Sequence, residues 1–312
     1  MAISNQQILV TGGAGFIGSH LTKRLVEMGC KVSIIDNFSN SNREEVVDGA
    51  SVIHADLTDQ NAIKQAVSAD FDLVIHLAAR KDPNDNDPQE QFAENTTMTH
   101  QLLNICKDAG IEKFVFASSS TVYGEAPRPT PEDYAPLEPI SAYGAAKLGG
   151  EGLVSTYAHS YEMTGFIFRF ANIVGPGLRG AVIPDFIERI QSNPDSLKIL
   201  GNGRQEKSYM HVDDCVDAML HVIDHVTEQT GPVYTFNLGT RTTTSVRKIA
   251  EIVCDTMGVD PTFEYTGGDR GWDGDVPKMR LSIEKIAVTG WNPNIESTVA
   301  VQTAAEELVD EI

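Results

Sequence analysis

The amino-acid sequence predicts an α/β fold, with a doubly wound parallel sheet and a smaller second α/β domain. Short apolar runs alternate with stretches of helical periodicity throughout the first half of the chain. A glycine-rich turn directly follows the first apolar run, and the regular alternation loosens beyond Asn172. Such alternation is typical of βαβ units, in which helices cover both faces of a parallel sheet and ligands bind at the carboxyl ends of its strands.

The individual elements follow from the spacing of the apolar residues. In the first half, strands are predicted at Gln7–Thr11, Lys31–Ile35, Ser51–Ala55, Asp72–Leu77, Lys113–Ser118 and Gly165–Phe170. Helices are predicted between them, at Phe16–Met28, Asp59–Val67, Gln89–Ala109 and Ala142–Glu162. In the second half, helices are predicted at Ile183–Gln191, Val212–His225, Ser245–Met257 and Ser297–Ile312, and a strand at Val233–Leu238.

Composition narrows the class of protein. The 312 residues include 44 acidic and 24 basic side chains, and the formal net charge of −20 disfavours nucleic acid or an anionic membrane as the main partner. Such a surface suits either a high-salt cytoplasm or an ordinary acidic soluble enzyme. The four cysteines are scattered, so we expect reduced thiols in a cytoplasmic protein rather than disulfides or a metal site. Neither a signal peptide nor a membrane span is expected.

Three glycines after the first strand predict a dinucleotide-binding turn. Gly12 allows the tight turn, Gly15 lets the backbone approach a pyrophosphate, and Gly18 lets the helix pack closely on the strand. The helix start at Phe16 and Ile17 offers amide donors and a positive dipole end to the phosphates. A turn that merely requires glycines is the alternative, but the preceding strand and the following helix favour cofactor binding.

Asp36, at the end of the second predicted strand, indicates which cofactor binds. A carboxylate here accepts both ribose hydroxyls and repels a 2′-phosphate, so NAD is predicted rather than NADP. Arg43 keeps NADP open, because an arginine could hold that phosphate. Further cofactor contacts are predicted near strand ends, from Asn37, Asp56, Leu57, Leu77, Ala78 and Ala79. His76 is expected to be structural rather than catalytic.

Tyr143 and Lys147 lie four residues apart and therefore share one face of a predicted helix. A lysine ammonium beside a phenol favours the phenolate, so the tyrosine can act as a base near neutral pH. A surface tyrosine packed on a lysine stem is the alternative. The glycine turn and the upstream cluster Ser118-Ser119-Ser120 favour the catalytic interpretation.

In this order and spacing, the motifs resemble those of extended short-chain dehydrogenase/reductases in the NAD-dependent nucleotide-sugar epimerase/dehydratase family, most closely the UDP-glucose 4-epimerase branch. The motifs in register are Thr11–Gly18, Asp36, Asp56-Leu57, His76–Ala79, Asn95, Ser118–Gly124, Tyr143 with Lys147, Arg169–Asn172 and His211–Asp214. The resemblance implies a Rossmann-type NAD-binding domain over residues 1–172, rejoined by about 208–240. A nucleotide-sugar-binding domain would lie mainly within 173–312.

The resemblance also implies a role for each residue of the predicted site. Tyr143 would remove the proton from a sugar hydroxyl while hydride passes from the same carbon to NAD, and the hydride would later return to the opposite face. Lys147 would hold the nicotinamide ribose and lower the pKa of Tyr143. Ser119 would hydrogen-bond the reacting oxygen. Asn95 and Ser118 would contribute to the cofactor site.

Other functions known for the same fold are alternatives to C4 epimerisation. The related sugar 4,6-dehydratases and decarboxylases carry a glutamate two residues before the equivalent of Tyr123, and some dehydratases add an aspartate just before that glutamate. Here the two positions are Thr121 and Ser120, so an elimination lacks its acid. An NAD-dependent sugar dehydrogenase would use the same scaffold, as would a non-catalytic NAD-sensing protein, although the latter has no need of Tyr143 and Lys147.

The substrate side matches the family less closely. The resemblance implies a UDP-sugar bound by Ser119, Tyr123, Tyr143, Asn172, Lys207 and Arg270. Lys207 stands where an arginine is usual, so the bidentate fork is lost, and Arg204 or Arg270 would compensate. The proline-rich segment Ala126–Pro139 is predicted to be an ordered wall of the active site.

The resemblance further implies a homodimer, because relatives often pack two long helices of each subunit into a four-helix bundle. Gly149, Gly150 and Gly152 lie inside the predicted helix of Tyr143, where each costs about 1 kcal/mol relative to alanine. We therefore predict that these glycines permit close helix approach in the dimer, and that Gly150→Leu weakens it.

Overall fold

The computed structural model describes residues 3–41, 43, 46–81, 87–226 and 231–312. The chain divides into two compact units. The first comprises Met1–Val122, Ala142–Arg169 and Met219–Phe236, and the second comprises Tyr123–Ser141, Phe170–Ala218 and Asn237–Ile312. Each unit is thus assembled from three stretches of sequence. The assignment of the cofactor to the first unit and of the nucleotide sugar to the second stays a prediction.

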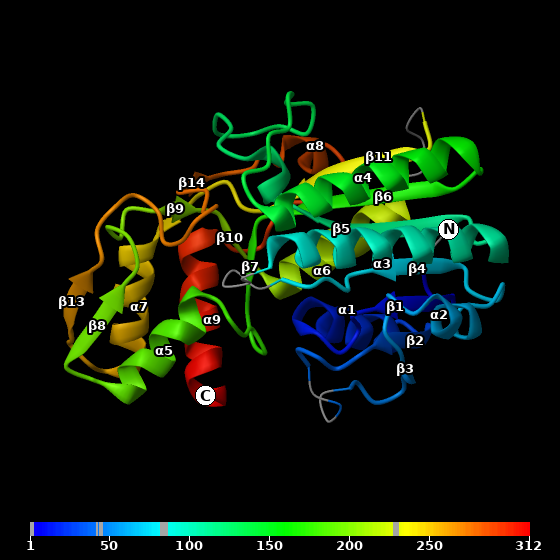
Figure 1. Cartoon of the computed structure of the whole chain (residues 1–312). Coiled ribbons are helices and arrows are strands. Elements are labelled where there is room, and N and C mark those ends of the chain that lie inside the picture. The colour runs from blue at the N-terminus through cyan, green and yellow to red at the C-terminus, as the bar shows by residue number, and fades with distance from the viewer. Residues whose placement is uncertain (1–2, 42, 44–45, 82–86, 227–230) are drawn as a thin grey trace. The chain divides into compact units, whose positions relative to one another are not determined.

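A seven-stranded parallel sheet forms the centre of the first unit (Figure 1). Its strands are β1 (Gln7–Thr11), β2 (Lys31–Asp36), β3 (Ser51–His54), β4 (Leu73–His76), β5 (Lys113–Ser119), β6 (Thr164–Phe170) and β11 (Val233–Leu238). The strand order is β11-β6-β5-β4-β1-β2-β3, so the chain winds outward from β1 in both directions. This order confirms the predicted doubly wound fold, in which ligands bind where the winding direction reverses.

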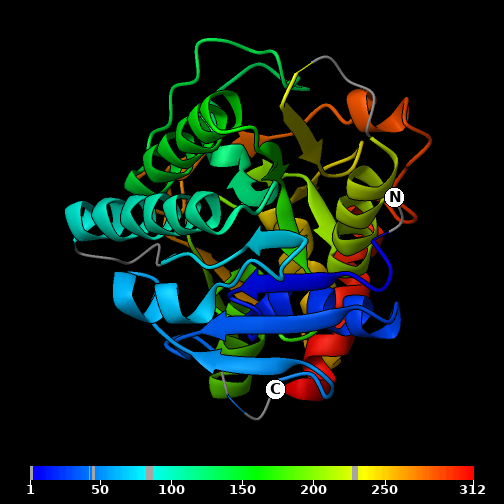
Figure 2. The ribbon, with the colours of Figure 1, turned by 90° about the vertical axis from the view of Figure 1, so that its right-hand side faces the viewer.

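The helices of the first unit follow from local sequence. They are α1 (Phe16–Glu27), α2 (Gln60–Ala66), α3 (Pro88–Ala109) and α4 (Ala142–Ser160). Asp59 caps the start of α2 and Asp87 caps the start of α3, which ends at Gly110 in the left-handed conformation. Helices α3 and α4 lie side by side (Figure 2). Together with α2 they share one core with the sheet, which includes Phe116 and Val154.

The second unit combines short strands with longer helices. Its strands are β7 (Asn172–Val174), β8 (Ser196–Ile199), β9 (Glu206–Lys207), β10 (Tyr209–His211), β12 (Thr244–Ser245), β13 (Thr262–Tyr265) and β14 (Lys278–Met279). Its helices are α5 (Val182–Ser192), α7 (Val246–Met257), α8 (Glu284–Ala287) and α9 (Ser297–Glu311), and α6 (Val212–His225) runs from this unit into the first. Buried residues of α5, α7 and α9, such as Ile187, Val253 and Val301, form its core.

The short strands of the second unit are what the sequence analysis did not predict. They pair as β10-β7, β12-β9-β14 and β13-β8. Strands of two to four residues are too short to show the alternation of apolar and polar residues by which strands are recognised. The longer elements, by contrast, form within a few residues of their predicted bounds.

Candidate active site

The glycine turn between β1 and α1 has a geometry that fits a dinucleotide. Gly12 has a φ of +69°, and a Cβ there would lie 2.8 Å from the backbone nitrogen of Ala78. A Cβ at Gly18 would lie 2.0 Å from the oxygen of Gly12, so internal packing requires both glycines. At Gly15, a Cβ would meet, among the described atoms within 4 Å, only that oxygen at 3.3 Å. Its missing side chain therefore leaves space beside the helix start at Phe16, where free amides suit a phosphate.

Asp36 lies at the end of β2, beside this turn. Its carboxylate accepts hydrogen bonds from the amide of Ala14 at 3.0 Å, the amide of Phe38 at 2.9 Å and the hydroxyl of Ser41 at 3.0 Å. An ionised carboxylate has about four acceptor positions, so these bonds fix its orientation and still leave acceptor capacity for a ribose hydroxyl. The arrangement fits the predicted NAD.

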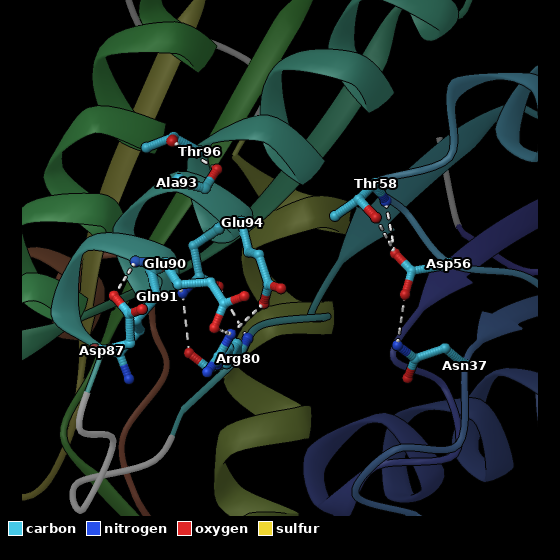
Figure 3. Close-up of polar contacts among 11 residues, drawn as sticks. Asn37, Asp56, Thr58, Arg80, Asp87, Glu90, Gln91, Ala93, Glu94 and Thr96 are labelled. Carbon is cyan, nitrogen blue, oxygen red and sulfur yellow. Dashed lines mark hydrogen bonds and ion pairs between the residues drawn. The ribbon is translucent and has the colours of Figure 1, made fainter.

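Asn37 and Asp56, both predicted to contact the cofactor, are hydrogen-bonded to each other (Figure 3). Asn37 Nδ2 donates to Asp56 Oδ2 at 3.1 Å, and Asp56 Oδ1 accepts from the hydroxyl of Thr58 at 2.7 Å and from its amide at 2.8 Å. The hydrogen bonds from Thr58 lower the pKa of Asp56. Leu57, between Asp56 and Thr58, is buried. The predicted residues at the ends of β2 and β3 are therefore brought together.

The segment after β4 carries the next predicted cofactor residues, which are Leu77, Ala78 and Ala79. His76 precedes them and is buried, with Nδ1 2.7 Å from the hydroxyl of Thr11 and Nε2 3.1 Å from the hydroxyl of Thr99. Burial lowers the pKa of His76 to about 3, so the ring is neutral at physiological pH. These contacts match the structural role that the sequence favoured.

Asn95 holds the backbone just beyond this segment. Its side chain accepts from the amide of Arg80 at 2.9 Å and donates to the carbonyls of Arg80 at 2.9 Å and Gln91 at 2.8 Å. Arg80 also forms ion pairs with Glu90 and Glu94 of α3 (Figure 3). Asn95 thus fixes the chain that leads away from β4, and its contact with the cofactor stays a prediction.

Ser119, Tyr143 and Lys147 are contributed by the end of β5 and the start of α4. Lys147 is buried, and its Nζ donates to the carbonyl of Ala117 at 2.7 Å and lies 5.6 Å from the centre of the Tyr143 ring. Ser119, two residues beyond Ala117, accepts from the amide of Thr121 at 3.2 Å and from its hydroxyl at 3.0 Å. The structure therefore brings the predicted Ser–Tyr–Lys set to the carboxyl end of β5.

The pKa values of this pair differ from the prediction. Burial raises the pKa of Tyr143, although the residue is not fully enclosed. Burial, followed by the charge of Lys81, lowers the pKa of Lys147 to about 7. The predicted lowering of the tyrosine pKa by the lysine is therefore not seen, because desolvation opposes both charges. No motif marked Lys81 in the sequence.

A buried ion pair next to Lys147 is a feature that the sequence analysis missed. Glu151 accepts hydrogen bonds from Ser118 Oγ at 2.5 Å, Arg169 Nε at 2.9 Å and Arg169 Nη2 at 2.7 Å. The hydroxyl of Ser118 therefore donates inside the protein, and only its acceptor positions remain for a cofactor. Glu151 and Arg169 are 18 residues apart, so no local spacing in the sequence marks their pairing.

Tyr123, predicted to bind the substrate, lies in the second unit and is buried. Its hydroxyl donates to Asn237 Oδ1 at 2.8 Å, and Asn237 Nδ2 donates to the carbonyls of Thr130 at 3.0 Å and Ser282 at 3.1 Å. The amide of Asn237 donates to Glu132 Oε1 at 2.9 Å. These bonds hold the proline-rich segment in place, so it is ordered rather than a linker. Its role as an active-site wall stays a prediction.

Lys207 and Arg270, the two predicted cationic substrate ligands, converge on Asp275. Lys207 Nζ donates to Asp275 Oδ1 at 2.5 Å, and Arg270 donates to the carbonyl of Asp275 and to the carboxylate of Glu125. The hydrogen bond to Glu125 is the main cause that raises the pKa of Arg270. Asn172, the other predicted ligand in this unit, begins β7 and is partly exposed.

Arg204, which was considered as a replacement for the missing family arginine, lines an open cavity of about 430 Å³ together with residues such as Glu125 and Asp269. Glu125 is also the carboxylate that accepts from Arg270. Arg270 has the more direct link to Lys207, because both donate to Asp275.

The proposed function of the helix glycines requires a correction. Gly150 faces the sheet, and a Cβ there would lie 2.3 Å from Phe116 Cζ of β5. It is therefore needed for the packing of α4 on its own sheet, and the prediction that Gly150→Leu reports on a dimer contact was wrong. A Cβ at Gly149 would make ordinary contact with Thr96 of α3 at 3.5 Å. Around Gly152, a Cβ would find no described atom within 4 Å. The homodimer itself stays a prediction.

Two kinds of feature are absent from the described residues. No group of three or more His, Cys, Asp or Glu side chains in this part of the chain could hold a metal ion. None of the helices described has both the length and the apolar character needed to cross a membrane.

Comparison with known proteins relates this geometry to a family. A sequence profile described as NAD dependent epimerase/dehydratase family matches residues 8–239. A putative UDP-glucose 4-epimerase of Methanocaldococcus jannaschii is 31% identical, and the alignment covers 93% of this chain and 94% of the relative. A dTDP-D-glucose 4,6-dehydratase of Mus musculus is 28% identical over 96% of this chain and 88% of its own length.

Solved structures agree with the fold. A UDP-galactose 4-epimerase superposes with a TM-score of 0.90 at 39% identity, covering 98% of this chain and 99% of the other. The UDP-glucose 4-epimerase of Thermus thermophilus, solved in complex with NAD, superposes with a TM-score of 0.86 at 28% identity, covering 98% and 100%.

Proposed function

Because this chain belongs to the NAD-dependent epimerase/dehydratase family, we propose that it interconverts nucleotide sugars at C4, in the manner of UDP-glucose and UDP-galactose. The family makes the protein an NAD-dependent enzyme. The choice of epimerisation over the other reactions of the family, and of a UDP-sugar as substrate, belongs to the proposal.

The residues of the first unit fit NAD. The turn around Gly12, Gly15 and Gly18 would hold the pyrophosphate, Asp36 would accept the adenosine ribose, and Lys147 would donate to the nicotinamide ribose. When bound, NAD supplies a hydride acceptor that can return the same hydride, so no second redox partner is needed.

Tyr143, Ser119 and Lys147 would share the proton chemistry. Tyr143 removes the proton from the 4-hydroxyl of the sugar as the C4 hydride leaves, which gives a 4-keto sugar. Ser119 donates a hydrogen bond to that oxygen and limits the charge that develops on it. After the keto sugar has turned over, Tyr143 returns the proton to the oxygen as the hydride returns to the opposite face.

The choice of epimerisation over elimination is based on the residues that follow Ser119. Loss of water at the neighbouring carbons requires an acid, and a carboxyl group is the usual one. The two residues that follow Ser119 are Ser120 and Thr121, and the hydroxyl of Thr121 donates to Ser119 at 3.0 Å. These hydroxyls are poor acids, so oxidation and re-reduction of one carbon is favoured over elimination.

The proposal of a UDP-sugar as substrate is based on residues of the second unit and on the relatives. Arg270 and Lys207 bond the carboxylates of Glu125 and Asp275, so a diphosphate would share or replace these partners. The UDP-glucose 4-epimerases among the relatives act on UDP-sugars by name. Which sugar turns over, with or without N-acetyl or uronic groups, is left to experiment.

A panel of UDP-, dTDP-, GDP- and CDP-sugars, followed by NMR with catalytic NAD, tests the proposal. We expect a C4 epimer of equal mass from at least one UDP-sugar, with no steady accumulation of NADH. A product lighter by one water would assign a dehydratase instead. Stoichiometric NADH would assign a sugar dehydrogenase, and the absence of any product with intact NAD binding would favour an NAD-sensing protein.

A further inference from the structure

The buried pair of Glu151 and Arg169 has no role in the chemistry described above, yet it lies directly behind the residues that perform it. Glu151 follows Lys147 by four residues and Tyr143 by eight, so the three side chains lie along one face of α4. Glu151 is 6% exposed, Arg169 is 6% exposed and Lys147 is 4% exposed. A buried carboxylate is costly unless it is paired, so its placement requires a reason.

Consecutive residues at the end of β5 connect this pair to the catalytic set. The carbonyl of Ala117 accepts from Lys147 at 2.7 Å, and the hydroxyl of Ser118 donates to Glu151 at 2.5 Å. The next residue is Ser119. Two side chains of α4, one turn apart, are thus bonded to two successive residues of β5. These bonds set the register between the strand that carries Ser119 and the helix that carries Tyr143.

Charges of both signs meet in the same cluster. Lys147 and Arg169 are two buried cations, and Glu151 is the carboxylate bonded to one of them and adjacent along the helix to the other. Lys81, beyond β4, adds a further positive charge that disfavours the Lys147 ammonium, whereas Glu151 favours it. His76 of β4 is neutral. The other titratable groups on α4 are Tyr143, one turn before Lys147, and Tyr157 and His159 toward the end of the helix.

We propose that Glu151 is a positioning residue for the proposed epimerase reaction: held by Ser118 and Arg169, it fixes α4 on β5 and places a buried negative charge one helical turn from Lys147. The inference rests on the proposed function for its kinetic consequence. Its electrostatic part concerns only the first unit and holds for any reaction in which Tyr143 and Lys147 act.

Neutral replacement of Glu151 and of Arg169 should shift the two pKa values in opposite directions. Glu151→Gln keeps the shape and an acceptor for Ser118 but removes a negative charge, which lowers the pKa of both Tyr143 and Lys147. We expect both limbs of the pH profile of kcat to move to lower pH by about one unit, and kcat at pH 8 to fall about 10-fold. Arg169→Gln removes a positive charge, so both limbs move to higher pH.

Two further variants separate the effect of charge on the pH profile from the effect of packing. The double variant Glu151→Gln with Arg169→Gln restores the net charge of the cluster, so its limbs return toward those of the wild-type enzyme. Val154→Ala, a buried residue of the same helix, lowers stability by cavity formation without changing any charge, and its limbs should stay in place.

A titration that needs no turnover distinguishes failure of this inference from failure of the proposed function. NMR of lysine labelled at the ε-carbon is recorded for each variant and for the same variant carrying Lys147→Met, so that the difference reports on Lys147 alone. The Lys147 titration should move with the same signs as the pH limbs. If Glu151→Gln and Arg169→Gln both leave it unmoved, the inference is overturned, even if the wild-type protein epimerises UDP-sugars. If the titration moves but no sugar is epimerised, the inference stands and the proposed function fails.

Discussion

At the scale of single residues, Tyr143 and Lys147 show how far a spacing can be trusted. Four residues on a helix place two side chains on one face, and the structure places the Lys147 ammonium 5.6 Å from the Tyr143 ring. The spacing does not reveal how much water surrounds the pair. Burial opposes the charged form of both groups, so in the protein without cofactor the pKa of Tyr143 is raised and that of Lys147 is lowered to about 7.

Replacement of the tyrosine tests its assigned chemistry. Tyr143→Phe should lower kcat by about 10²- to 10⁴-fold, the usual contribution of a general base, because the phenyl ring cannot take the proton. NAD affinity, measured by calorimetry, should change little, since the ring keeps its shape. Tyr161→Phe, at an exposed tyrosine just beyond the same helix, is the control and should keep full activity. An active Tyr143→Phe protein would remove Tyr143 from the mechanism.

At the scale of the elements, α4 carries the active-site residues on one face and depends on small residues to approach the sheet. Gly150 lies against Phe116 of β5, and the hydrogen bonds of Lys147 and Glu151 run from the same helix to the same strand. The sequence showed only that three glycines were costly in a helix. It could not show which face each one occupied relative to β5 and α3.

A pair of glycine variants tests this packing. Gly150→Leu should lower the free energy of unfolding by about 1–3 kcal/mol, because the added side chain overlaps the Phe116 ring. Gly152→Ala, where a Cβ would meet no described atom within 4 Å, should raise it by up to about 1 kcal/mol through helix propensity. Chemical denaturation followed by circular dichroism measures both. A Gly150→Leu protein as stable as the wild type would contradict the packing seen here.

At the scale of the whole molecule, charge is the dominant feature. A formal net charge of −20 on 312 residues means that like charges repel in the folded state and that salt should relieve this repulsion. Raising KCl from about 0.1 M to about 1 M shortens the screening length from about 10 Å to about 3 Å. Recovery of about 1–2 kcal/mol would raise the thermal midpoint by about 1.5–3 °C over this range, which is the rise that we expect.

The control for this salt effect is pH. Close to pH 4.7, the isoelectric point of the sequence, the net charge vanishes and the gain from KCl should vanish with it. Scanning calorimetry at both pH values measures the difference. Equal midpoints in low and high KCl at neutral pH would show that the acidic surface is no more than that of an ordinary soluble enzyme.

The sequence by itself determined the fold class and the NAD cofactor, and it singled out the residues that are proposed to bind this cofactor. The glycine turn, Asp36 and the Tyr143–Lys147 spacing depend on local backbone geometry, because each motif lies within one turn, one strand end or one helix face. The same is true of the long strands and helices, whose apolar periodicity reflects burial on one or two faces. Local rules sufficed for these features.

Only the tertiary structure decided what surrounds those motifs. The convergence of Lys207 and Arg270 on Asp275, and the bonds that connect Ser118, Glu151 and Arg169, join residues far apart in the chain. The pKa values of Tyr143 and Lys147 likewise depend on desolvation by several elements at once. Packing between distant segments, and the dielectric environment it creates, leave no periodic trace in a single sequence, so they emerge only when the chain is folded.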